Sequence, residues 1–262
     1  MTTAKLRQMK QNGEKIAMLT SYDFTLASLV DEAGIDMLLV GDSASNVVCG
    51  NMYTLPMTVD EMIFLTKGVV RAAQHALVVC DMPFGSYQVN ADEAVRNAIK
   101  ILKESGCDAV KLEGGEEIIE GIRRMVQSGV PVMGHLGLTP QSVNQFGGYG
   151  LRAKEEREAE KLLHDAKLLD EAGCFAITLE KIPAALAEKV TKAVSCPVIG
   201  IGAGNGTDGQ VLVLHDMLGL NQGFKPKFLR HFANLADDVK GAVGEYISAV
   251  KDSSFPSAEE SY

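Results

Sequence analysis

The sequence has no excess of basic residues. Its 25 lysines and arginines stand against 34 aspartates and glutamates, which gives a formal net charge of -9. A surface of this sign repels a phosphate backbone. We therefore expect no nucleic-acid partner.

Long apolar runs are also missing. The first residues, MTTAKLRQMK, carry charges with no apolar segment behind them, unlike a secretory signal. Other apolar runs, such as 37–40, are far shorter than the roughly 20 residues that span a bilayer. The five cysteines are odd in number and form no CxxC motif, so we expect reduced thiols rather than a redox pair or a zinc site. These absences favour a cytoplasmic protein with no membrane partner.

The sequence does contain a repeated alternation of helix-like and strand-like segments. Apolar stripes at helical spacing, as in 94–102, 118–126 and 159–169, are followed by a glycine and then by a short apolar run. Because these runs are apolar throughout, they are typical of parallel strands covered on both faces. The eight candidate strands are 16–20, 37–41, 77–80, 109–112, 130–134, 176–179, 198–201 and 211–214.

Eight such strands alternating with helices predict an α/β fold, a (β/α)₈ TIM barrel, rather than an open sheet. We expect one domain over residues 1–262, with an N-terminal helix at about 3–11 and a polar C-terminal tail at about 252–262. A long amphipathic helix is expected over 228–250. Only 202–210 separate the last two strands, which is short for a helical crossover. We expect a single turn there, or an eighth strand placed wrongly.

Polar residues end five of the predicted strands. They are Asp42, Asp81, Glu113, His135 and Glu180. Because the strands are parallel, these side chains meet at the carboxyl rim, where the active sites of such barrels lie. An acid just after a strand can instead cap the next helix, and Asp23 fits that role better than a ligand role.

Several carboxylates at one depth repel one another, and a cation would relieve that repulsion. Oxygen ligands favour Mg²⁺, with Mn²⁺ as the alternative, over zinc. Lys111 lies two residues before Glu113 and shares its strand face, so it either pairs with an acid of the protein or binds a substrate carboxylate. The Ser43 hydroxyl could contact the same anion or bond local backbone. His135 is either a hydrogen-bond donor to the substrate or a structural histidine.

A glycine-rich stretch, IGIGAGNGTDG at 199–209, follows the seventh strand. Many barrels bind phosphate in this position. Tight turns explain the glycines equally well, because the full dinucleotide-binding pattern is absent.

Five separated motifs resemble the ketopantoate hydroxymethyltransferase family. They are VGDS at 40–43, DMPF at 81–84, KLEGG at 111–115, GHLGLTPQSVN at 134–144 with FGGY at 146–149, and IGIGAGNGTDGQ at 199–210. The resemblance covers about 16–228. It implies a Mg²⁺-dependent barrel of the phosphoenolpyruvate/isocitrate-lyase type. It also implies transfer of a hydroxymethyl group from 5,10-methylenetetrahydrofolate to 3-methyl-2-oxobutanoate, giving 2-dehydropantoate for pantothenate synthesis.

Carried over by motif, the resemblance also implies residue roles. Asp42, Asp81 and Glu113 would hold the metal, Glu180 would accept a proton, and the substrate contacts would be Ser43 and Lys111, with Asp42, Asp81 and His135 beside them. A homo-oligomer is expected, since members of this family are often decamers. Two segments depart from the family pattern, Ala44-Ser45-Asn46 and Asn51-Met52-Tyr53, and both bear on the choice of keto acid.

Overall fold

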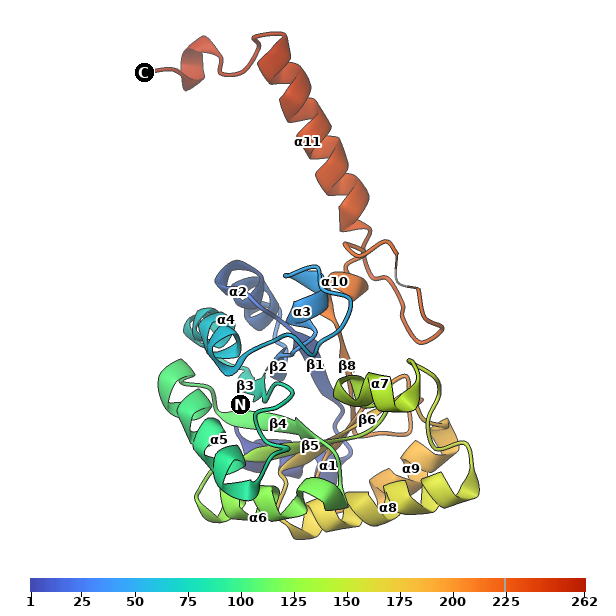
Figure 1. The fold of residues 1–262 in the computed structure, drawn as a ribbon. Helices are drawn as coiled ribbons and strands as arrows, with labels where there is room; N and C mark the ends of the chain where they lie inside the picture. Colours follow the sequence, from blue (N-terminus) through green and yellow to red (C-terminus); the bar gives the residue numbers. More distant parts are fainter. Residues whose placement is uncertain (224) are drawn as a thin grey trace. The chain divides into compact units, whose positions relative to one another are not determined.

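The computed structural model describes residues 1–223 and 225–262. They form two compact units, Met1–Val213 and Leu214–Tyr262. The first unit is a closed barrel of parallel strands in the order β1 to β8 (Figure 1). The strands are β1 Ile16–Thr20, β2 Met37–Val40, β3 Leu77–Asp81, β4 Ala109–Glu113, β5 Val132–Gly137, β6 Ala176–Glu180, β7 Val198–Ile201 and β8 Gly209–Leu212. The predicted fold class is confirmed.

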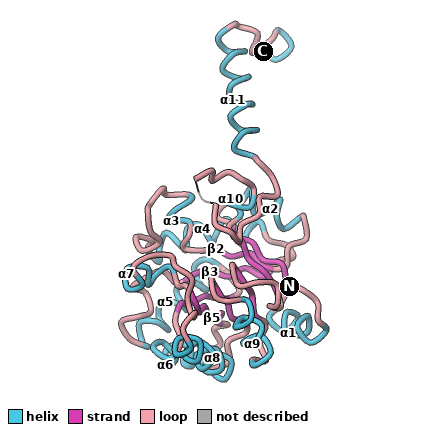
Figure 2. The backbone as a smooth tube through the Cα atoms, turned by 90° about the vertical axis from the view of Figure 1, so that its right-hand side faces the viewer, coloured by secondary structure: helices cyan, strands magenta, loops and turns pink. Residues whose placement is uncertain are grey.

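Helices surround these strands in the first unit, as the tube view in Figure 2 shows. The α-helices are α1 Thr3–Asn12, α2 Phe24–Glu32, α3 Ala44–Val47, α4 Val59–Ala72, α5 Ala91–Ser105, α6 Ile119–Gln127, α7 Val143–Phe146, α8 Glu156–Glu171 and α9 Ala184–Ala193. Two 3₁₀ turns, η1 Glu116–Ile118 and η2 Pro140–Ser142, follow β4 and β5. Asp23 caps α2 by accepting the N–H of Leu26 at 2.9 Å, so its predicted capping role is confirmed.

Two apolar clusters follow from the strand pleat, because successive residues of a strand face opposite sides of the barrel wall. Leu38 and Val78 belong to the larger cluster, which the surrounding helices share. The alternate positions Met37 and Leu77 belong to a smaller cluster inside the barrel. Leu6 of α1 is fully buried in that inner cluster, so α1 closes the amino end of the barrel.

The inner face turns from apolar to polar towards the carboxyl ends of the strands. Its residues are Leu77, Val79 and Asp81 on β3; Ala109, Lys111 and Glu113 on β4; Met133 and His135 on β5; and Ala176, Thr178 and Glu180 on β6. Strand register keeps them level, since Asp81 pairs with Lys111 and Glu113 pairs with His135. A polar layer therefore lies on top of an apolar plug.

Two strands differ from their predicted ranges by more than one residue. β5 runs to Gly137 rather than 134, because its last residues pair with the end of β6, Gly137 opposite Glu180. His135 thus lies inside this strand and not at its end. β8 begins at Gly209 rather than 211, where it pairs with both Ile16 and Ile199. The described segment 202–208 contains no helix, which agrees with the expected turn.

The second unit contains α10 Leu214–Met217, α11 Leu235–Lys251 and the 3₁₀ turn η3 Ala258–Glu260. The predicted long helix was wrong in its start, at 228. The N–H groups of Phe232 and Leu235 bond carbonyls of Met217 and Leu218, so the segment before α11 is tied to the end of α10. The organisation of both units as one domain stays a prediction.

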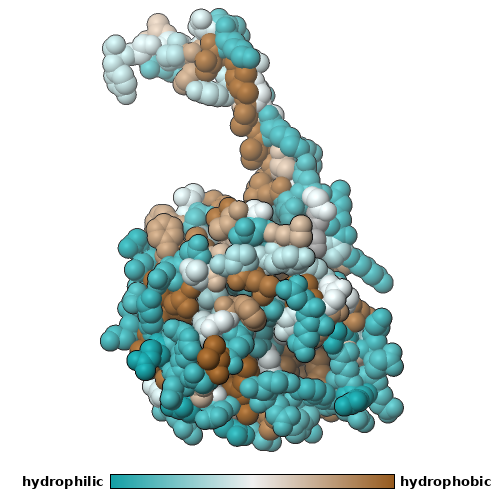
Figure 3. All heavy atoms as spheres, in the orientation of Figure 1, coloured by the Kyte–Doolittle hydropathy of each residue, from teal (hydrophilic) through white to brown (hydrophobic). Residues whose placement is uncertain are grey.

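One side of α11 carries exposed apolar residues, visible as a brown band along the helix in Figure 3. They are Val239, Val243, Tyr246, Ile247 and Val250. Across the described ranges, none of the helices combines the length and the apolar character required to cross a bilayer.

Candidate active site

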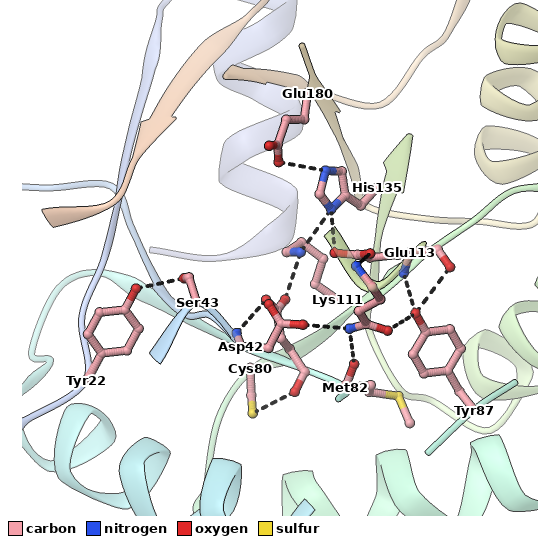
Figure 4. A network of polar contacts seen from close by, with 12 residues as sticks. Tyr22, Asp42, Ser43, Cys80, Met82, Tyr87, Lys111, Glu113, His135 and Glu180 are labelled. Atoms are coloured by element: carbon pink, nitrogen blue, oxygen red, sulfur yellow. Dashed lines mark hydrogen bonds and ion pairs between the residues drawn. The ribbon is translucent and has the colours of Figure 1, made fainter. Parts of the chain in front are cut away.

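Lys111 forms a buried ion pair with Asp81 of the adjacent strand (Figure 4). Its Nζ lies 2.9 Å from Oδ1 of Asp81, and both side chains are 5% exposed. Burial opposes the charge on Lys111, but the neighbouring carboxylates outweigh burial and raise its pKa. Burial also raises the pKa of Asp81, against the pull of Lys111. Lys111 is thus a fixed cation on the inner face, as its spacing predicted.

Asp42 lies two residues beyond β2 and contacts Asp81. Its backbone N–H donates to Oδ2 of Asp81 at 3.0 Å. A Cβ on the intervening Gly41 would lie 2.8 Å from Oγ of Ser43 and 3.5 Å from Oδ2 of Asp81. The present position of the Ser43 hydroxyl therefore depends on glycine at residue 41, while the contact with Asp81 would be an ordinary one. Burial, followed by the charges of Asp81 and Glu113, raises the pKa of Asp42 to about 8.

Glu113 is held on three sides. Oε2 accepts the backbone N–H of Gln141 at 2.9 Å, and Oε1 lies 3.3 Å from Nδ1 of His135. The backbone N–H of Glu113 donates to the Tyr87 hydroxyl at 3.1 Å. This carboxylate is fixed in direction although its strand ends at the same residue.

His135 lies between two glutamates. Its Nδ1 faces Glu113 and its Nε2 lies 3.3 Å from Oε2 of Glu180. Nζ of Lys111 is also 3.3 Å from Nδ1. Burial and the charge of Lys111 oppose protonation, but the bonds to the two glutamates prevail and raise the pKa of His135 to about 9. Glu180 itself is only partly buried, so a ligand can reach it.

Ser43 is half-buried, and its Oγ lies 2.8 Å from the hydroxyl of Tyr22 (Figure 4). Ser43 occupies the position before α3 without capping that helix. The local-backbone alternative for its hydroxyl is therefore not what the structure has. Tyr22, which follows β1, was not singled out from the sequence.

The side-chain chemistry of this group suits a hard divalent cation, while its carboxylate oxygens do not all lie within 4.8 Å of one another. Asp42, Asp81 and Glu113 are three buried carboxylates beside two buried cations, Lys111 and the protonated His135, which leaves a formal charge of -3 + 2 = -1 when all are ionised. Burial first, and then the charges of Asp81 and Glu113, raise the pKa of Asp42, so a bound cation would favour its ionised form. Oxygen donors of this kind suit Mg²⁺ or Mn²⁺.

A second acidic trio lies elsewhere. Glu116, His164 and Asp165 are the group of described residues whose ligand atoms all lie within 4.8 Å of one another. Asp165 is already ion-paired with Lys161 at 2.6 Å. Glu116 and His164 are exposed, so this trio lies at the surface and not among the buried carboxylates of the barrel rim.

Sequence reasoning missed two residues of the polar layer, Tyr87 and Gln141. Gln141 is 5% exposed, and its Nε2 donates to Oδ2 of Asp42 at 2.8 Å. Its neighbours Pro140 and Ser142 form η2 with it, and all three fall within the motif GLTPQS. A glutamine in a loop gives no signal of burial, and only the motif pointed to this segment.

The two segments that depart from the family pattern contact each other. Oγ of Ser45 donates to the carbonyl of Tyr53 at 2.7 Å and accepts from Nδ2 of Asn51 at 3.2 Å. Nδ2 of Asn46 donates to the carbonyl of Asn51 at 2.9 Å. The departures are therefore one structural feature, directly after Asp42 and Ser43.

The glycine-rich loop between β7 and β8 is bonded internally. Oγ1 of Thr207 donates to the carbonyl of Gly209 at 2.8 Å, and Nε2 of Gln210 donates to the carbonyl of Gly204 at 2.9 Å. Gly204 has a φ of +78°, and a Cβ there would lie 2.5 Å from Cβ of Ala184. Tight turning accounts for this glycine.

The chain matches the ketopantoate hydroxymethyltransferase family over residues 1–258. The 3-methyl-2-oxobutanoate hydroxymethyltransferase of Porphyromonas gingivalis is 60% identical over 100% of this chain and 96% of its own length. That of Flavobacterium johnsoniae is 59% identical with the same coverage.

Solved structures with low identity share the fold. A phosphoenolpyruvate phosphomutase from Streptomyces platensis has a TM-score of 0.63 at 13% identity, over 97% of this chain and 88% of its own. A 2,3-dimethylmalate lyase of the PEP mutase/isocitrate lyase superfamily has a TM-score of 0.58 at 17% identity, over 98% and 90%.

Fold and site together define a (β/α)₈ enzyme whose acidic site lies at the carboxyl rim of the barrel. The full-length match places it more narrowly: the chain belongs to the ketopantoate hydroxymethyltransferase family.

Proposed function

We propose that this chain transfers a hydroxymethyl group from 5,10-methylenetetrahydrofolate to 3-methyl-2-oxobutanoate, giving 2-dehydropantoate. Membership of the family supports the reaction. The structural observation that supports this reaction is the partly exposed carboxylate of Glu180, which lies beside a buried group of three carboxylates and one lysine. A 2-oxo acid needs both features, since its carboxylate must be neutralised and its C3 proton removed.

Lys111 supplies the positive charge for the substrate carboxylate. It is fixed by Asp81, so it keeps its place before the substrate binds. The Ser43 hydroxyl, positioned by Tyr22, is the second contact for the same carboxylate.

Glu180 takes the proton from C3. A positioned general base contributes about 10²–10⁴-fold to a rate. His135 orients this carboxylate through Nε2 and is itself held from the other side by Glu113. His135 is therefore proposed as a positioning residue for the base rather than as a contact of the substrate.

Asp42, Asp81 and Glu113 would hold the divalent cation. When bound, such an ion supplies Lewis-acid polarisation of the 2-oxo group. We propose Mg²⁺, with Mn²⁺ as a substitute, because the donor atoms are all carboxylate oxygens.

The carbon acid then reacts with the folate. C3 loses its proton to Glu180, and the resulting enolate carbon forms a bond to the methylene carbon of the folate. One of the two bonds from that methylene to folate nitrogens breaks as the carbon–carbon bond forms, and this nitrogen takes the proton held by Glu180. The second bond breaks when water supplies the hydroxyl group to the methylene and its remaining proton to the other nitrogen, and tetrahydrofolate leaves.

Proton exchange tests the proposal. The protein is incubated with 3-methyl-2-oxobutanoate and Mg²⁺ in D₂O without folate, and loss of the C3–H signal is followed by NMR. We expect metal-dependent exchange, and formation of ketopantoate once methylenetetrahydrofolate is added. The absence of both exchange and product would overturn the proposal.

We also propose that the chain works in the cytoplasm as a homo-oligomer of up to ten copies, as the family resemblance implies. Light scattering coupled to size exclusion measures the mass directly, and a monomer of 28.1 kDa would contradict this assembly.

A further inference from the structure

The two outer carboxylates of the site come from parts of the chain that do not pair. Asp42 follows β2 and Glu113 ends β4, with β3 between them in the barrel. No strand register therefore sets their separation. Like charges at this depth would move apart unless a donor held them together.

Gln141 contacts both. Its backbone N–H donates to Oε2 of Glu113 at 2.9 Å, and its side-chain Nε2 donates to Oδ2 of Asp42 at 2.8 Å. Nε2 also donates to the carbonyl of Met82 at 3.0 Å. One residue in the turn after β5 thus spans β2 and β4 without adding charge.

The orientation of this amide is set from its other end. The Tyr87 hydroxyl donates to Oε1 of Gln141 at 2.6 Å, and Nε2 of Gln88 donates to the same atom at 3.1 Å. Because Asp42 and the carbonyl of Met82 can only accept, a flipped amide would lose both of these bonds. The Tyr87 hydroxyl also accepts the backbone N–H of Glu113. This bond closes a ring of hydrogen bonds through Glu113, Gln141 and Tyr87.

We propose that Gln141 is a positioning residue that orients the carboxylates of Asp42 and Glu113 for binding of the divalent cation, and that Tyr87 fixes the amide of Gln141. This inference rests on the proposed function, because it takes these carboxylates as the metal ligands. It goes further in assigning the geometry of the metal site to a neutral glutamine outside the ligand set.

Glutamine is suited to this position for a chemical reason. A glutamate would add a further negative charge and has no donor for Asp42 when ionised. A methionine fills similar space but leaves one oxygen of Asp42 without its donor, while the backbone N–H to Glu113 remains. The change Gln141→Met therefore removes one half of the bridge.

Mn²⁺ binding to the full chain without substrates tests the inference, with the free Mn²⁺ signal measured by EPR. Loss of an outer-shell partner costs about 10–100-fold in metal affinity. We expect Gln141→Met to raise the Kd for Mn²⁺ by that factor, and Tyr87→Phe to raise it less. The matched control is Gln127→Met, an exposed residue at the end of α6, with the Kd of the wild type.

The outcomes separate the two proposals. A folded Gln141→Met protein with the wild-type Kd overturns the inference, whatever the wild type does with the keto acid. If Gln141→Met does not fold by circular dichroism, Tyr87→Phe decides, and an unchanged Kd there overturns it too. If wild-type protein binds Mn²⁺ and Gln141→Met binds it weakly, the inference holds even where no C3–H exchange occurs and the proposed function fails.

Discussion

The ring of His135 lies midway between two glutamates, with Nε2 3.3 Å from Glu180 and Nδ1 3.3 Å from Glu113. β5 places the histidine between β4 and β6, which carry these two residues. The proposed base and one proposed metal ligand are thus joined by a single side chain. Because Glu180 is linked to Glu113 through His135, the base can be changed while the metal ligands stay in place.

We expect Glu180→Gln to slow C3–H exchange by about 10²–10⁴-fold, the contribution of a general base. Metal and keto-acid affinity should remain near the wild-type values, because Glu180 lies outside the buried group of carboxylates. NMR in D₂O gives the exchange rate, and calorimetry gives both affinities.

The matched control for this change is Glu188→Gln in α9, an exposed residue paired with Lys192, for which we expect wild-type exchange. Undiminished exchange in Glu180→Gln would remove Glu180 from the role of base.

Asp81→Asn should weaken Mg²⁺ binding by more than the roughly 10–100-fold that outer-shell changes cause. The change removes an anionic oxygen and leaves the Lys111 ammonium without its partner at 2.9 Å. Calorimetric titration with MgCl₂ measures the effect. Asp60→Asn, which alters an exposed ion pair with Lys100, serves as control. An unchanged Mg²⁺ affinity in Asp81→Asn would mean that Asp81 serves only to pair Lys111.

Much of this site could be predicted because it follows from strand geometry. The alternation of the pleat places Lys111 and Glu113 on one face, and parallel strands bring Asp81 level with them. Such relations are local or depend on strand order alone. The barrel and its acidic rim were therefore visible in the sequence.

Other features depend on contacts between distant segments. Gln141 donates a hydrogen bond to Asp42, which is 99 residues away in the sequence, and no local sequence pattern around Gln141 indicates that contact. The start of α11 likewise depends on the backbone bond from Leu235 to Leu218 rather than on helical periodicity. Apolar spacing finds helices and strands, but it does not report which buried polar atoms meet.

We expect Gly41→Ala to weaken keto-acid binding and leave Mg²⁺ binding less affected. The added Cβ would lie 2.8 Å from Oγ of Ser43, so this hydroxyl would have to leave its position beside the Tyr22 hydroxyl. The expected result is a raised KM for 3-methyl-2-oxobutanoate, from initial rates. Gly244→Ala in α11 has no atom within 4 Å of the new Cβ and should keep the wild-type KM. An unchanged KM in Gly41→Ala would separate Ser43 from substrate binding.

Asp31 in α2 is a buried carboxylate that stabilises the barrel away from the site. Its oxygens accept the backbone N–H groups of Gln74, His75 and Ala76, just before β3, at 2.8 to 3.2 Å. Burial opposes its charge, but these three donors, with the charge of His75, hold the pKa of Asp31 below its ordinary 3.8. We expect Asp31→Asn to lower the free energy of unfolding by about 1.5–3 kcal/mol at pH 7, the range for hydrogen bonds to a charged group.

The same shift fixes the sign of the pH dependence. A carboxylate whose pKa is lower in the folded than in the unfolded state stabilises the fold fully above its unfolded pKa, and loses that contribution as pH falls through the folded value. Urea unfolding of Asp31→Asn and wild type should therefore differ most above about pH 5, begin to converge near about pH 4, the unfolded pKa of aspartate, and converge fully below the lower folded pKa. Asp238→Asn, at an exposed position of α11, should follow the wild-type curve throughout. A difference between Asp31→Asn and wild type that stayed constant down to pH 3 would mean that the carboxylate charge is not what the three N–H groups require.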